Sequence, residues 1–112
     1  MIAEIHPDIG RGDAERLWDL ERLGALMAAR VEEARRARSS LSEAGPEEAF
    51  RAKFLTGDGI VKALAEDPLL PPRLLPDGWA AGELREEFRK FDEEATDRSR
   101  PFWSRIIRKE EA

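Results

Sequence analysis

The sequence predicts an all-α fold, a small helical domain of about four helices with a strap between the second and third main helices. Apolar residues recur every three or four positions in the longer segments, as they do on the buried face of an amphipathic helix. No segment alternates apolar and polar residues as a half-buried strand does. The strap, Asp67–Trp79, holds four of the seven prolines together with four leucines, and prolines are poorly tolerated inside helices.

The length of 112 residues predicts one domain, residues 13–112, preceded by an N-terminal arm, residues 1–12. The arm has three isoleucines at helical spacing, but His6-Pro7 and the glycines at 10 and 12 argue against a stable helix. We therefore expect the arm to dock on a neighbouring molecule or on the domain itself.

Charge and composition exclude several classes of function. With 24 acidic and 19 basic residues the net charge is −5, whereas nucleic-acid-binding domains usually carry a basic surface, so no direct nucleic-acid binding is expected. The chain has no cysteine and one histidine, so we expect no metal site and no cofactor. It has no apolar run long enough for a bilayer and no signal-peptide pattern, which predicts a cytoplasmic protein without membrane contact.

The first helix is predicted to run from an N-cap at Asp13 to about Arg38, with Glu32 and Arg36 forming an i,i+4 ion pair. Its basic end, with Arg35, Arg36 and Arg38, is open to two interpretations, a phosphate site or a solvated last turn that suits the helix dipole. The expected buried stripe consists of Leu17, Leu20, Leu23, Met27, Val31 and Ala34.

The second helix is predicted to begin at Pro46, where a missing N–H costs nothing, and to end near Glu66. Gly57 and Gly59 lie in its middle, and each costs about 1 kcal/mol relative to alanine. Either the helix kinks or breaks there, or the glycines allow another backbone or a ligand to come close. The expected stripe consists of Phe50, Phe54, Gly57, Val61 and Leu64.

Beyond the strap, in which we predict one helical turn at Pro72–Leu75, a third helix is expected from Gly82 to Arg98. Its stripe is Leu84, Phe88, Phe91 and Ala95, and its i,i+4 ion pairs are Glu86 with Lys90 and Glu94 with Arg98. Its many carboxylates suit either acid–base chemistry or a solvated face.

A short fourth helix is predicted from Pro101, capped by Ser99. It should return its large apolar residues to the core, while residues 109–112 fray. Those apolar residues are Phe102, Trp103, Ile106 and Ile107.

The strap and its neighbours resemble the C-terminal region of PaaX-type repressors, bacterial regulators of phenylacetic acid catabolism. The resemblance is carried by a DP-x-LP-x-x-LLP-x-x-W pattern running into a helix, and by a Trp-Asp-Leu at the start of the first long helix. In this chain those residues are Asp67-Pro68, Leu70-Pro71, Leu74-Leu75-Pro76, Trp79, Phe88 and Trp18-Asp19-Leu20.

The resemblance spans about residues 13–108 and implies a regulatory domain without the winged-helix and ferredoxin-like parts of full-length family members. It also implies an effector, phenylacetyl-CoA, that releases such repressors from DNA. The chain departs from the pattern in two places. Between Asp58 and Pro68, where family members often carry a histidine and an arginine, Lys62 is the only cation. After Trp79, Ala80-Ala81 stands where a Pro-Gly is common.

Two functional hypotheses follow, neither with catalytic residues. In the first, the domain senses an aryl-acetyl-CoA-like effector, with Trp79 and Trp18 stacking on it and Arg73 and Lys62 binding its phosphate or carboxylate. In the second, it is a protein–protein interaction or dimerisation module that binds a second copy or a full-length regulator. A pocket around Gly57–Gly59 and Trp79 would favour the sensor, and an exposed apolar patch the interaction module.

Overall fold

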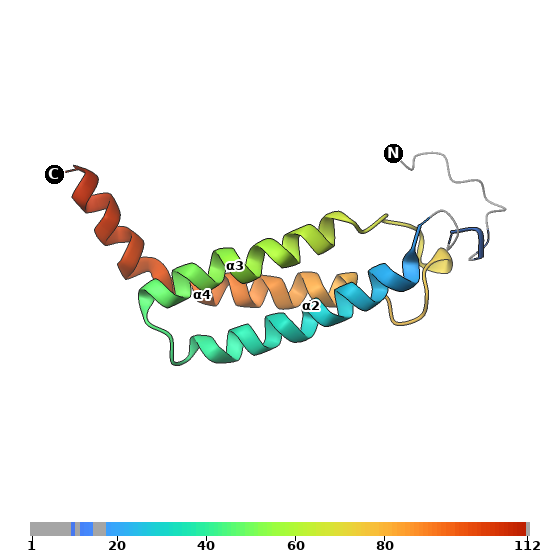
Figure 1. The fold of residues 1–112 in the computed structure, drawn as a ribbon, viewed down its shortest axis with the longest axis horizontal. Coiled ribbons are helices and arrows are strands. Elements are labelled where there is room, and N and C mark those ends of the chain that lie inside the picture. The colour runs from blue at the N-terminus through green and yellow to red at the C-terminus, as the bar shows by residue number, and fades with distance from the viewer. Residues whose placement is uncertain (1–9, 11, 15–17, 112) are drawn as a thin grey trace.

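The computed structural model describes residue 10, residues 12–14 and residues 18–111, with side chains up to Lys109. These residues form three long α-helices and one short 3-10 helix, and none of them lies in a strand, which confirms the all-α prediction. The three helices lie side by side in an elongated bundle (Figure 1). Apart from residues 10 and 12, the predicted arm lies outside the described residues, as does Leu17.

Helix α2, Leu20–Leu41, begins six residues later than predicted because Asp19, and not Asp13, is its N-cap. The Asp19 carboxylate accepts a hydrogen bond from the backbone N–H of Arg22 at 3.2 Å. Asp13 lies in an earlier helical segment, where its carboxylate accepts from the Gly10 N–H. The described part of the predicted stripe is confirmed, and Leu41 extends it to the end of the helix.

Helix α3, Pro46–Ala65, matches its predicted range and is unbroken through its two central glycines. A β-carbon at Gly57 would lie 3.6 Å from the Phe88 ring, and one at Gly59 would lie 3.6 Å from the Arg30 guanidinium. Both distances are ordinary van der Waals contacts, so neither position excludes a β-carbon, and the helix does not break at its glycines.

The predicted stripe of α3 is partly wrong. Its buried face is built from small residues and one isoleucine, whereas Phe54 and Val61 are 57% and 52% exposed. Small side chains let α3 approach its neighbours closely, which turns the larger ones outward. The buried residues are Ala49, Gly57, Ile60 and Ala63.

The strap crosses from α3 to α4 and contains the predicted helical turn, η1, Pro72–Leu74. Leu70 and Leu74 are buried, while Leu69 is 75% exposed. At the start of the strap, Asp67 accepts hydrogen bonds from the Leu69 N–H at 3.1 Å and from Arg85 of α4 at 2.7 Å. Apolar burial and the ion pair of Asp67 with Arg85 thus fix the strap to the bundle.

Helix α4, Ala81–Glu111, is continuous, so the predicted break between a third and a fourth helix is wrong. Instead, α4 changes direction near Pro101, and its last turns leave the bundle (Figure 1). Proline lacks the N–H that would bind the Asp97 carbonyl, and its ring crowds that carbonyl, so a bend is expected there. Ser99 does not cap a new helix; its hydroxyl donates to the Thr96 carbonyl at 3.0 Å.

The core consists of three apolar clusters spaced along the bundle. The central cluster joins all three helices and includes Met27, Ile60 and Leu84. A second lies under the strap around Leu20 and Leu74, and a third lies around Leu41 and Phe91. The residues beyond Pro101 belong to none of these clusters, so their predicted return to the core is wrong.

We expect Leu74→Ala to destabilise the domain by about 2–5 kcal/mol, because it removes a fully buried side chain from beneath the strap. Leu69→Ala is the matched control, and this exposed position of the same strap should change the free energy of unfolding by less than about 0.5 kcal/mol. Urea unfolding followed by circular dichroism measures both. Equal losses would contradict the assigned burial.

Candidate functional site

The two tryptophans predicted to bind a ligand meet at the strap end of the bundle. Trp18 and Trp79 are both half-buried and pack against the cluster under the strap, and Trp79 also packs against the central cluster. A β-carbon at Gly24 of α2 would lie 3.4 Å from the Trp79 ring, so this glycine leaves room for the indole.

The indole nitrogen of Trp79 is buried, yet it donates to none of the described residues. A buried donor without an acceptor costs about 1–3 kcal/mol, so such groups are uncommon in folded proteins. This unpaired N–H is the polar feature of the strap end that an added acceptor could satisfy.

The two predicted cationic ligands are placed differently. Arg73 lies exposed in η1, within the strap. Lys62 lies on α3 with its side chain 74% exposed, and it pairs with Asp58 one turn earlier at 2.9 Å. Among the described residues, no contact joins Lys62 to either tryptophan.

The hollow at Gly57 is not lined by either tryptophan. A shallow hollow of about 250 Å³ lies between α3 and α4, and Trp79 is not among its lining residues. Its lining consists of Lys53, Phe54, Gly57, Asp58, Val61, Phe88 and Asp92.

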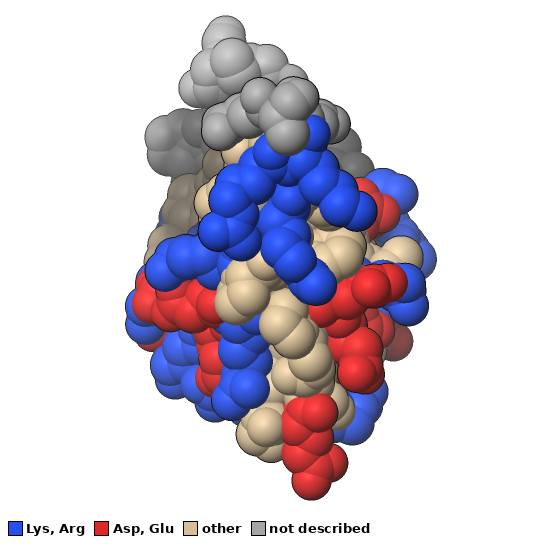
Figure 2. Space-filling model, turned by 90° about the vertical axis from the view of Figure 1, so that its left-hand side faces the viewer, with Lys and Arg blue, Asp and Glu red and all other residues tan. Residues whose placement is uncertain are grey.

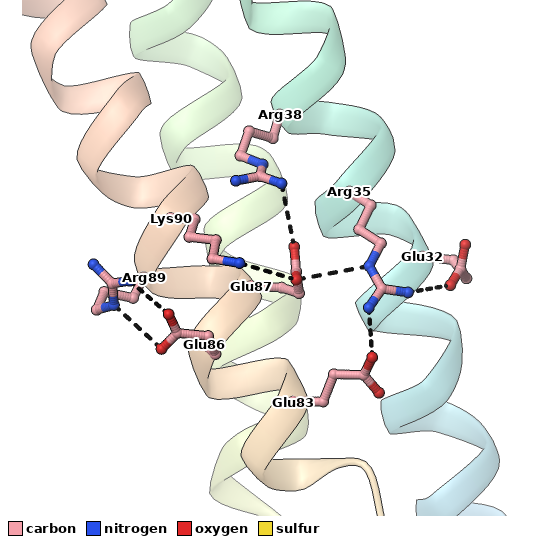
Figure 3. Close-up of polar contacts among 8 residues, drawn as sticks. All are labelled: Glu32, Arg35, Arg38, Glu83, Glu86, Glu87, Arg89 and Lys90. Atoms are coloured by element: carbon pink, nitrogen blue, oxygen red, sulfur yellow. Dashed lines mark hydrogen bonds and ion pairs between the residues drawn. The ribbon is translucent and has the colours of Figure 1, made fainter.

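A belt of ion pairs joins α2 to α4, and Glu87 is at its centre (Figure 3). Glu87 is only 7% exposed, and its carboxylate lies 3.7 Å from Arg35, 3.8 Å from Arg38 and 3.7 Å from Lys90. These distances are longer than hydrogen bonds, so the carboxylate is held by surrounding charge. Arg35 also binds Glu32 and Glu83.

The belt explains the basic end of α2, which was open to two interpretations. Arg35 and Arg38 face carboxylates of α4, so they bridge two helices. The hydrogen bond to Glu83 raises the pKa of Arg35. The predicted pairing of Arg36 with Glu32 is wrong, because Arg35 occupies that carboxylate.

Further along α4, Arg89 pairs with Glu86 and Glu93, which replaces the predicted pair of Glu86 with Lys90. The hydrogen bond from Arg89 lowers the pKa of Glu86. The predicted pair of Glu94 with Arg98 is confirmed at 3.6 Å. The carboxylates of this helix thus form ion pairs, and the described residues contain no cluster able to hold a metal ion.

An apolar groove lies at the opposite end of the bundle from the strap, between the first half of α3 and the last turns of α4. Its main hollow has a volume of about 390 Å³, and Phe50 contacts both Phe54 and Phe102 with ring centroids 5.0 and 5.1 Å apart. Leu55 and Ile106 are 71% and 41% exposed. The main hollow is lined by Glu47, Phe50, Arg51, Phe54, Leu55, Phe102 and Ile106.

Sequence reasoning missed this groove because it assigned Phe50, Phe54 and Phe102 to the core. A signal was present, since Leu55 lies about 100° around the helix from Phe54 and outside the predicted stripe. Figure 2 views this end of the molecule and shows basic side chains above a strip of uncharged surface, with acidic side chains beside and below it.

We expect Glu87→Gln to lower the melting temperature by about 5 °C, because three neighbouring cations would lose their shared carboxylate. Glu86→Gln, at an exposed position of the same turn, should shift it by no more than about 1 °C. Thermal unfolding followed by circular dichroism tests the pair. A similar shift in both variants would show that the belt has no special role in stability.

None of the described helices has a stretch long and apolar enough to cross a membrane.

Comparison with known proteins identifies the family. No curated protein and no solved structure matches the chain. The family model described as PaaX-like protein C-terminal domain matches residues 18–105, which include the strap and its pattern of proline, leucine and tryptophan. The chain therefore belongs to the PaaX-like C-terminal domain family, as its sequence pattern predicts.

Proposed function

We propose that this chain is a non-catalytic regulatory domain that acts by binding another protein through the apolar groove. Family membership relates it to PaaX regulators, a group that is non-enzymatic in general. The observation that carries the proposal is the exposure of Phe54 and Leu55 beside Ile106 on one continuous surface. Contiguous apolar surface of this kind is typical of sites for protein partners.

The groove is built on ordered elements, which suits a binding surface. Its floor is the aromatic contact between Phe50 and Phe102, which connects α3 to the bent end of α4. Next to it, Lys53 of α3 binds Asp92 at 2.6 Å and Thr96 at 3.0 Å, both on α4. These contacts hold the two walls together, so a partner would meet a preformed surface and lose less entropy in binding.

The natural class of partner is a full-length PaaX-type regulator or another copy of this domain. In either case, binding shifts the regulator between its operator-bound and free states only if those two states bind the groove with different affinities. The domain would therefore act through that difference in affinity.

A test titrates this chain into a full-length PaaX-type repressor bound to a fluorescent operator and follows anisotropy. The wild-type chain should shift the apparent operator affinity by about fivefold or more. Leu55→Glu should abolish the shift because it places a charge in the groove. Leu69→Glu, at an equally exposed leucine of the strap, should keep it. If Leu55→Glu acts like the wild type, the groove is not the contact surface.

Effector sensing is the second candidate function, and the buried, unpaired N–H of Trp79 supports it. A thioester or carboxylate oxygen could accept from this group while an aryl ring packs beside Trp18. Arg73, in the neighbouring strap, is the candidate for a phosphate contact. Lys62, which pairs with Asp58, has less support from the structure than from the sequence.

Thermal unfolding with and without phenylacetyl-CoA tests this candidate. A ligand at about 100 times its Kd adds about 2.7 kcal/mol of stability, a rise of several degrees for a domain of this size. Trp79→Phe should remove most of the rise, whereas Trp103→Phe, at the groove end, should keep it. An absent rise, or an equal effect of the two substitutions, would exclude sensing of this ligand at the strap.

A further inference from the structure

The ion pairs of this chain are incomplete at one end of the molecule. Along α2 and the body of α4, most described basic side chains pair within the chain, as Arg35, Arg85 and Arg89 do. In the last turns of α4 the pattern stops. There, Arg105, Arg108 and Lys109 are exposed and form no ion pair with any described acidic side chain.

Two acidic side chains at the same end also lack an ion pair with any described basic side chain. Glu43, in the turn between α2 and α3, and Glu48, in the first turn of α3, are exposed and pair with no described basic side chain. Their neighbour Glu47 pairs with Arg51 at 3.1 Å, so its charge is compensated.

The two sets of unpaired charges flank the apolar groove. Arg105 and Lys109 line a hollow of about 210 Å³ together with Glu47, Phe102 and Ile106, next to the main hollow, which Glu47 also lines. On the other side of the groove, Glu48 lies in the first turn of α3, which continues to the exposed Phe54 and Leu55. Figure 2 shows basic side chains above an uncharged strip and acidic side chains beside and below it, so charges of both signs border this end of the molecule.

We propose that this surface binds a second copy of the chain, antiparallel and related by a two-fold axis through the apolar groove. In such an interface each residue meets its counterpart reciprocally, so the basic end of α4 faces Glu43 and Glu48 of the partner copy twice. Leu55 of each copy enters the groove of the other. The proposal rests on the proposed function and names the partner of its groove.

The presence of both charges favours a second copy over other partners. A nucleic acid or an anionic membrane would suit Arg105, Arg108 and Lys109, but its phosphates would also approach Glu43 and Glu48. A copy of the same surface satisfies both sets and covers the exposed leucine and isoleucine. Complementary charges of this kind fix orientation and suppress wrong partners.

The experiment measures self-association of the full chain by sedimentation velocity, from about 1 to 200 µM, which covers the micromolar affinities of modest interfaces. Leu55→Glu should weaken dimerisation at least about tenfold, while Leu69→Glu, at the strap end, should leave it unchanged. Circular dichroism checks that each variant is folded.

Charge reversal supplies the decisive comparison. Glu43→Lys/Glu48→Lys and Arg105→Glu/Arg108→Glu should each weaken self-association about tenfold, because like charges then face each other twice. Mixed together, the two variants should form a heterodimer within about threefold of the wild-type affinity, since every facing pair is again opposite in sign.

A monomeric wild type throughout this range, or a mixture that fails to associate, would overturn the proposed dimer. Binding of the monomer to vesicles of anionic lipid, lost in Arg105→Glu/Arg108→Glu, would also overturn it and assign this end to a membrane surface. Neither result bears on whether the groove binds a full-length repressor, because the operator titration with Leu55→Glu tests that binding separately.

Discussion

The structure depends on the position of Trp79 between two apolar clusters. Its indole packs against both the central cluster and the cluster under the strap, and it lies 3.4 Å from where a β-carbon of Gly24 on α2 would be. The buried Leu70 and Leu74 of the strap and the pair of Asp67 with Arg85 add to this contact. The return of the chain from α3 into α4, and hence the alignment of all three helices, follows from where the strap is seated.

The two ends of the bundle have different physical characters. At the strap end most apolar side chains are buried or half-buried, and the backbone changes direction at the short helix η1. At the other end α3 and α4 diverge around exposed aromatic and aliphatic groups. Between them, the belt around Glu87 connects α2 and α4 by charge, which contributes modest stability but defines how the helices face each other.

Much of the fold could be predicted from the sequence, because helical periodicity and proline placement are local signals. They located α3, η1 and the stripes of α2 and α4 correctly. The errors came from tertiary packing. Periodicity cannot show that small residues such as Ala49 and Gly57 take the buried face of α3 and turn Phe54 outward. A proline looks the same in sequence whether it begins a helix or bends one, so the course of α4 and the groove beside Pro101 required the structure.

The bend at Pro101 also separates two kinds of selection on this chain. Residues before the bend are constrained by the three clusters, where a changed volume costs folding free energy. Residues after it contribute to none of those clusters, so most of their substitutions leave the packing of the three clusters unchanged. The last turns of α4, and with them the shape of the groove beside Phe102, can thus change while the bundle that carries them stays the same.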